Sequence, residues 1–126
     1  MSAAFVDRPQ VGRRFARVAA TYEQADFFAR EVDRRMQERL DYVKVEPQRI
    51  VDLGCSRGAS HAGLAARYPQ AQIIGVDIAP AMLQAGRSSR AGWQRWFGLG
   101  RTGEMQRLAA DAVKLPIKSQ STAVVW

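Results

Sequence analysis

Residues 50 to 58, IVDLGCSRG, place an acidic side chain directly before a run of small residues. Asp52 comes at the end of an apolar run, and Gly54, Ser56 and Gly58 follow at every second position. Small residues let a ligand lie against bare backbone amides, close to the start of a helix. The spacing therefore predicts a ligand site where a buried strand meets the following turn.

Two further aspartates follow apolar runs in the same way. Asp77 lies in QIIGVDI, about twenty residues after the glycines, and Asp111 lies in MQRLAADA. An acid at that distance commonly accepts hydrogen bonds from ribose hydroxyls. In an open parallel sheet, ligands bind at the carboxyl ends of the strands. The pattern therefore favours a nucleoside ligand at this edge of the sheet.

The glycine pattern also narrows the kind of nucleoside. A phosphate-binding loop would need Gly-Lys-Ser/Thr, which is absent from the sequence. A dinucleotide fingerprint would need glycines at 54, 56 and 59, where the chain has Gly54, Ser56 and Ala59. The early acid suits a ligand with a positively charged amino acid end and suits a pyrophosphate poorly.

The elements that must position these residues alternate between strand and helix, which predicts an α/β fold with a right-handed parallel sheet. Helices are expected over residues 12–22 and 26–44, with Pro47 closing the second. Its apolar stripe, expected to face the core, is Phe28, Val32, Met36, Leu40 and Val43. The later elements are the strands RIVDL, QIIGVDI, MQRLAADA and TAVVW and the helices ASHAGLAARYP and APAMLQAGR.

Composition bounds the function classes. The chain has 126 residues, 47% of them hydrophobic, and a net charge of +7. The charge favours acidic partners, and no apolar run is long enough to span a membrane. Cys55 is the only cysteine and His61 the only histidine, so the sequence predicts no metal site and no internal disulfide, as suits a cytoplasmic protein. Residues 86–104 hold three aromatics among arginines, which could form a nucleic-acid platform but fit a lid better.

Four segments carry a resemblance to a known family: RRFARVAATYEQADF, REVDRRMQERLDYVKVEPQRIVDLGCSRG, GVDIAPAMLQAGR and AADAVKLPI. With them the chain resembles the malonyl-acyl-carrier-protein O-methyltransferases of biotin synthesis, which are class I S-adenosylmethionine-dependent methyltransferases. The resemblance implies a Rossmann-like fold, S-adenosyl-L-methionine as cofactor, and O-methylation of the free carboxylate of a malonyl-acyl-carrier protein. It implies a cytoplasmic enzyme with no nucleic acid partner. A quinone-precursor methyltransferase and a non-catalytic cofactor-binding or assembly protein of the same fold stay open as alternatives.

The resemblance also implies cofactor-binding roles. The methionine part would be held by Asp52 and by the loop residues Gly54, Cys55, Ser56 and Gly58. For the adenosine part, Asp77 would bind the ribose hydroxyls, Ile78 would pack on the adenine, and Asp111 and Ala112 would contact the adenine edge. Tyr22 on the front helix would help to close over the cofactor. It assigns no catalytic residue.

The sequence departs from the family pattern in three places. Ser56 stands where glycine is usual, Arg57 where a small polar residue is usual, and Ala123 where an aspartate usually opens the fourth strand. We expect residues 1–46 to form an N-terminal helical cap and residues 47–126 to form the first half of the cofactor-binding domain, ending within the fourth strand. Since such a sheet has an unpaired edge, the 126-residue chain is expected to fold poorly and to be inactive alone.

Overall fold

A computed structural model describes residues 6–88 and 105–126 of the chain. The aromatic and arginine-rich segment predicted as a lid, residues 86–104, lies mostly outside the described residues. The elements are α1 (Arg8–Val18), α2 (Tyr22–Ala25), α3 (Phe27–Arg39), a 3-10 helix η1 (Leu40–Tyr42), β1 (Arg49–Leu53), α4 (His61–Arg67), β2 (Gln72–Asp77), α5 (Pro80–Ser88), β3 (Gln106–Ala109) and β4 (Val124–Val125).

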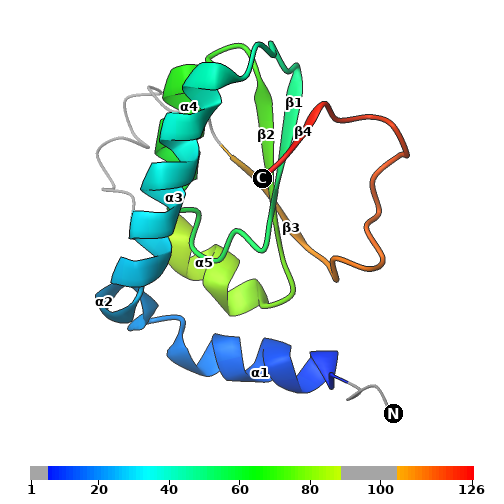
Figure 1. Cartoon of the computed structure of the whole chain (residues 1–126). Helices are drawn as coiled ribbons and strands as arrows, with labels where there is room; N and C mark the ends of the chain where they lie inside the picture. Colours follow the sequence, from blue (N-terminus) through cyan, green and yellow to red (C-terminus); the bar gives the residue numbers. More distant parts are fainter. Residues whose placement is uncertain (1–5, 89–104) are drawn as a thin grey trace, which may run out of the picture.

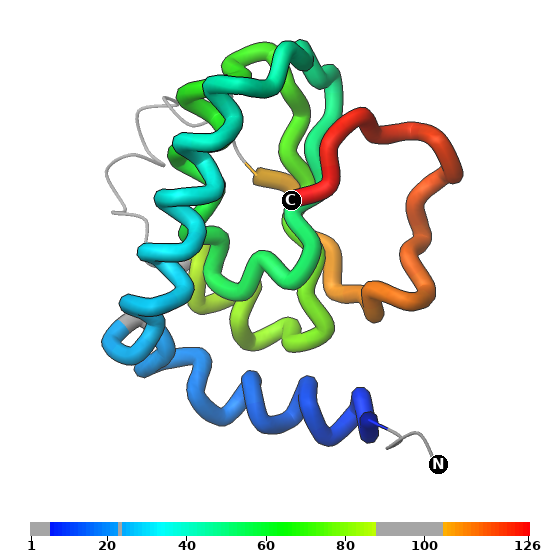
Figure 2. Tube along the Cα trace, in the orientation of Figure 1, coloured from blue at the N-terminus to red at the C-terminus, as the bar shows by residue number. Residues whose placement is uncertain are grey.

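The described strands form a parallel sheet in the order β3-β2-β1-β4, which confirms the predicted α/β architecture. In its register Asp52 lies opposite Gly75, and Asp77 lies opposite Ala109. Asp52 therefore lies two residues further back from the carboxyl edge than Asp77 does. Figure 1 shows α3, α4 and α5 on one side of the strands. Figure 2 shows the segment between β3 and β4 running outward on the other side before it returns to β4.

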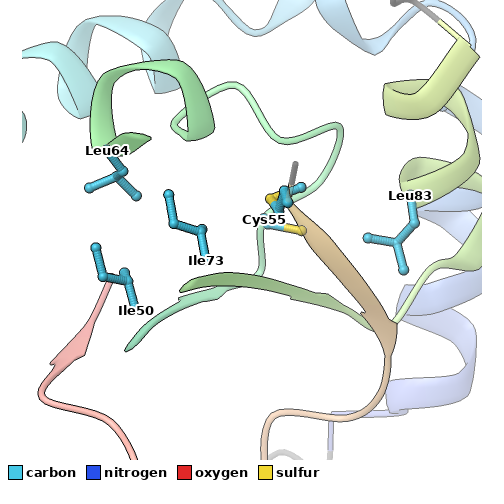
Figure 3. Close-up of a cluster of buried hydrophobic side chains, with 6 residues drawn as sticks. Ile50, Cys55, Leu64, Ile73 and Leu83 are labelled. Carbon is cyan, nitrogen blue, oxygen red and sulfur yellow. The ribbon is translucent and has the colours of Figure 1, made fainter. Parts of the chain in front are cut away.

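The main core lies between the sheet and the helices. Ile50 of β1, Ile73 of β2, Leu64 of α4 and Leu83 of α5 pack together with the side chain of Cys55 (Figure 3). Ile50 and Leu64 are fully buried. Burying an aliphatic side chain of this size contributes about 1.5–3 kcal/mol. The apolar strands are short, but they are buried on the side where the helices cover them, as expected for a βαβ arrangement.

The prediction that the apolar stripe of α3 faces the core is wrong. Phe28 is 71% exposed and Met36 is 43% exposed. Only Leu40, just after α3, packs against the core cluster. The face that α3 turns to the rest of the protein is polar, because Asp33 accepts hydrogen bonds from Ser60 and from Trp126, the last residue of the chain.

The first helix lies across the carboxyl ends of the strands (Figure 1). Asp7 caps α1, since its side chain accepts a hydrogen bond from the backbone N–H of Gln10 at 3.0 Å. The predicted helix over residues 12–22 is divided, because α1 ends at Val18 and Tyr22 begins the short α2. Between them Ala19 is buried in a second cluster with Ala79 and Met82, and this contact holds the end of α1 against α5.

Candidate functional site

A pocket of about 390 Å³ lies where the carboxyl ends of β1, β2 and β3 meet α1. This volume falls in the range of small-molecule sites. Seven of the residues predicted from the sequence line it: Tyr22, Gly54, Ser56, Asp77, Ile78, Asp111 and Ala112. Three others, Asp52, Cys55 and Gly58, lie outside the pocket lining.

The turn after β1 explains the small residues there. Gly54 has φ +74° and Gly58 has φ +86°, in the left-handed region that favours glycine. A Cβ on Gly58 would also lie 2.6 Å from the terminal methyl carbon of Met105. Ser56 adopts the same left-handed region with φ 51°, although it carries a side chain. A non-glycine residue adopts this backbone conformation at a cost in free energy.

Asp77 is held rigidly at the end of β2. Its carboxylate accepts hydrogen bonds from the backbone N–H of Ser56 at 2.9 Å and from that of Ala79 at 2.8 Å. The residue is 8% exposed, and it lines the pocket. A carboxylate has about four lone-pair sites, so Asp77 keeps acceptor capacity for two hydroxyl groups. The same aspartate thus joins the turn after β1 to the start of α5 and faces the pocket.

Asp52 lies beneath the pocket, as its register predicts. It is 3% exposed, and among the described residues its Oδ2 atom has no hydrogen-bond partner. Burial is the main cause that raises the pKa of Asp52 from 3.8 to about 6, with the carboxylates of Asp33 and Asp77 adding to it. A buried carboxylate without a partner is costly, and a cationic group placed beside it would lower that cost.

Asp111 lies just past β3 and faces α1 across the pocket. Its Oδ2 pairs with Nε of Arg8 at 3.0 Å, and its Oδ1 accepts from the backbone N–H of Val113 at 3.1 Å. Sequence reasoning missed Arg8, because its partner lies about a hundred residues away and no spacing links the two. The ion pair ties the start of α1 to the end of β3 and thereby closes one side of the pocket.

The pocket also has an apolar side that the sequence analysis did not predict. Val11 and Phe15 of α1 line it together with Val6. The ring of Phe15 meets that of Tyr22 edge-to-face, with centroids 6.4 Å apart and planes at 64°. No motif or spacing in the sequence links Val11 and Phe15 to the sheet, because their place in the pocket depends on how α1 crosses the ends of the strands.

Cys55 and Arg57 point away from the pocket. The side chain of Cys55 packs in the core, where burial raises the pKa of its thiol to about 12. The thiol is therefore protonated at neutral pH, and any contact of Cys55 with a ligand must come from its backbone. Arg57 donates from its guanidinium to the carbonyl of Ala19 at 2.9 Å and so ties the turn to the end of α1. Arg57 is absent from the pocket lining.

The described residues contain neither a membrane-spanning helix nor a cluster of metal-binding side chains. No helix within them is long and apolar enough to cross a membrane. Over the same residues, 6–88 and 105–126, no group of three or more histidine, cysteine or acidic side chains could hold a metal ion.

Comparison with known proteins identifies the class. A family model described as a methyltransferase domain matches residues 50–126. This is more than half of the chain, and the match includes the turn after β1 and both pocket aspartates. The chain therefore belongs to the methyltransferase domain family.

Within the methyltransferase domain family, the chain is similar to curated proteins that share one name. A malonyl-[acyl-carrier protein] O-methyltransferase from Methylovorus sp. is 43% identical over 121 residues, covering 96% of this chain and 40% of the relative. Another from Halorhodospira halophila is 44% identical over 121 residues, covering 96% of this chain and 38% of the relative. These relatives confirm the resemblance seen in the sequence. The chain spans about 40% of the length of such relatives.

Solved structures show the fold. A methyltransferase from Haloferax volcanii, solved in complex with a methyltransferase activator, has a TM-score of 0.65 at 24% identity, covering 89% of this chain and 45% of that one. The plantazolicin methyltransferase BpumL, solved with SAH, has a TM-score of 0.56 at 15% identity, covering 91% and 45%. These likenesses confirm the predicted Rossmann-like fold of class I methyltransferases.

Proposed function

We propose that this chain provides the S-adenosyl-L-methionine-binding part of a methyltransferase whose methyl acceptor is the free carboxylate of a malonyl-acyl-carrier protein. The observation that carries the proposal is the pocket at the carboxyl edge of the sheet, lined by Asp77 and Asp111, with the partnerless carboxylate of Asp52 beneath it. A nucleoside with a cationic amino acid end matches both features. The names of the curated relatives favour the malonyl carrier over a quinone precursor as acceptor.

The turn and the acid beneath it suit the methionine end of the cofactor. Asp52 would attract its ammonium group, because burial has left this carboxylate without a partner. Gly54, Cys55, Ser56 and Gly58 would present backbone to the amino acid part. Two of them, Gly54 and Ser56, line the pocket, and both have left-handed φ values.

The residues along the pocket suit the adenosine end. Asp77 would accept from both ribose hydroxyls, and Ile78, next along the chain, would pack on the adenine. Asp111 and the backbone amide of Ala112 would take the adenine edge. Tyr22 would close over the cofactor, together with the helical cap formed by residues 1–46.

Catalysis in such a site rests on positioning and on a dry, charge-matched pocket. The bound cofactor supplies a methyl group on a sulfonium, open to in-line attack by the acceptor oxygen. The chain's own contribution is to orient that group and exclude water. Asp77 fixes the ribose, Asp52 anchors the amino acid end, and Phe15 with Tyr22 shields the pocket from solvent. We place the protein in the cytoplasm, as suits its single reduced and buried cysteine.

Calorimetry with S-adenosylhomocysteine tests the proposal. Replacement of Asp77 by Ala removes the charged acceptor for the ribose hydroxyls, so we expect a loss of about 2 kcal/mol in binding free energy, or roughly thirtyfold in affinity. Asp41→Ala is the matched control, because Asp41 is an exposed carboxylate that pairs with Arg67 far from the pocket. Equal affinity of the Asp77→Ala variant and the unmodified chain would contradict the proposal.

A further inference from the structure

Helix α1 has two chemically different faces. Val11 and Phe15 point into the pocket. Arg13, Arg14 and Arg17 are exposed to solvent, and their spacing of three and four residues makes them neighbours on the helix surface. We call these three arginines the α1 basic face.

The α1 basic face is a concentration of unneutralised charge. Helix α1 contains no acidic residue, and among residues 6–88 and 105–126 no carboxylate pairs with these three arginines. The arginines of α3 differ in this respect. Arg34 and Arg35 both pair with Glu31, at 2.9 and 2.7 Å, and these two cations lower the pKa of Glu31 to about 2. Among the residues that the structure describes, these three arginines therefore form one cluster of exposed positive charge on the outer side of α1.

We propose that the α1 basic face is the docking surface for an acidic carrier protein that presents the methyl acceptor. This inference rests on the proposed function. The helix that carries the face also forms one wall of the pocket, through Val11 and Phe15. A carrier held there by charge would bring its acyl arm to the mouth of the pocket. Complementary charge of this kind steers encounter and sets orientation.

Two other partners of basic helices fit the surface less well. A single-stranded nucleic acid needs aromatic side chains beside the arginines for its bases to stack on, and the described aromatic of α1, Phe15, lies on the pocket side instead. A membrane surface needs the apolar face of the helix to enter the lipid. In α1 that face lines the pocket, and the adjoining Ala19 is buried against α5.

Charge reversal on α1 tests the proposal. A bacterial acyl carrier protein loaded with a malonyl group is titrated into the 126-residue chain at low and at physiological salt. The double variant Arg13→Glu, Arg17→Glu is expected to bind the carrier roughly tenfold or more weakly, with a shallower salt dependence. The control variant Arg39→Glu, Lys44→Glu carries the same change in net charge on exposed positions away from α1. The affinity of this control variant for the carrier is expected to fall less than about threefold, because its two new charges lie away from α1.

Three outcomes would overturn the proposal. They are failure of the carrier to bind the unmodified chain, equal losses in the two double variants, and tighter binding of anionic vesicles or single-stranded RNA to the α1 basic face at physiological salt. Binding of S-adenosylhomocysteine is measured on the same samples and is expected to stay unchanged in both variants. Failure of the unmodified chain to bind the carrier while it still binds S-adenosylhomocysteine therefore counts against the docking surface alone, whereas failure of the unmodified chain to bind S-adenosylhomocysteine counts against the proposed function.

Discussion

The electrostatics of the site depend mainly on the buried carboxylate of Asp52. Its pKa is raised to about 6, so the folded chain holds the Asp52 proton at a pH where the unfolded chain, with a pKa of 3.8, has lost it. Stability contributed by this group is therefore greatest at low pH, falls as the pH rises from about 4 to about 6, and then levels off. The full change is on the order of 3 kcal/mol.

The same shift predicts a pH dependence of cofactor binding. A ligand ammonium is attracted only by the ionised carboxylate, so the affinity for S-adenosylhomocysteine is expected to rise about tenfold between pH 5 and pH 7.5, as Asp52 ionises with a pKa of about 6. Calorimetry at several pH values measures this. In Asp52→Asn the affinity should be lower and flat over that range. The same tenfold rise in the Asn variant would assign the pH dependence to another group.

The left-handed conformation of Ser56 leads to a second prediction. Ser56→Gly relieves the strain of a side chain at φ 51°, but it also adds freedom to the unfolded chain. We expect a net gain of about 0.5–1 kcal/mol in the free energy of unfolding, measured by urea titration. Ser56→Ala keeps a Cβ in the same conformation, so it should show no such gain. A gain as large in the Ala variant as in the Gly variant would show that the backbone conformation is not the cause.

Among individual residues, the sequence was most informative for those whose roles depend on the backbone next to them. The turn residues and Asp77 were predictable, because small residues and an acid at a known spacing report directly on backbone geometry and ligand contacts. Arg8 was not predictable, because its ion pair with Asp111 depends on how the first helix crosses the sheet. The depth of Asp52 below the pocket followed only once the strand register was known.

Helix α3 is attached to the rest of the protein through a polar contact. Ser60 donates to the carboxylate of Asp33 at 2.6 Å, the indole N–H of Trp126 donates at 3.0 Å, and Gln37 donates at 2.9 Å. Asp33 thus joins α3 to the loop before α4 and to the end of β4. It is one of the two carboxylates near Asp52 that raise the pKa of that group.

Removal of this carboxylate should destabilise the fold. Asp33→Ala leaves the hydroxyl of Ser60 and the indole of Trp126 without their acceptor, so we expect a loss of about 1–3 kcal/mol in the free energy of unfolding. The exposed Asp41, which pairs with Arg67, provides the control, since Asp41→Ala should cost less than about 1 kcal/mol. Equal effects in urea unfolding would show that the Asp33 contacts contribute no more than a surface ion pair.

The sequence predicted the strands of the parallel sheet and the α3 helix, but it did not predict which side of α3 faces the rest of the protein. Alternation of apolar runs and helical patterns gave the parallel sheet, because each βαβ unit has one favoured hand and closes locally. The stripe from Phe28 to Met36 was periodic enough to predict the α3 helix. Periodicity does not say what will cover the stripe, however, and hydrogen bonds to Asp33 turn the polar side of α3 inward.

Among the residues that the structure describes, exposed apolar side chains include those on α3 and on β4. Phe28 and Met36 lie exposed on α3, and Val125 of β4 is 62% exposed. Among the described strands β4 pairs only with β1, so its other edge carries unpaired backbone groups. Exposed apolar side chains and an open strand edge both favour association with other chains.

We therefore expect the purified 126-residue chain to self-associate as its concentration rises, and to unfold with a sharp transition only at low concentrations where it stays monomeric. Light scattering over a concentration series and thermal unfolding by circular dichroism measure these two properties. Val32→Lys with Met36→Glu places charges on the α3 stripe and should reduce the association. A chain that stays monodisperse and melts cooperatively over the whole concentration series, and that transfers methyl groups, would contradict this prediction.

The roles proposed for the site residues all require that the pocket under α1 binds the adenosyl cofactor. The most direct measurement is a structure of the chain determined with S-adenosylhomocysteine. The predicted result is a ligand whose ribose hydroxyls lie within hydrogen-bond distance of Asp77, whose adenine packs on Ile78, and whose ammonium group approaches Asp52. A ligand bound at another place on the chain, or a pocket filled instead by protein side chains, would contradict it.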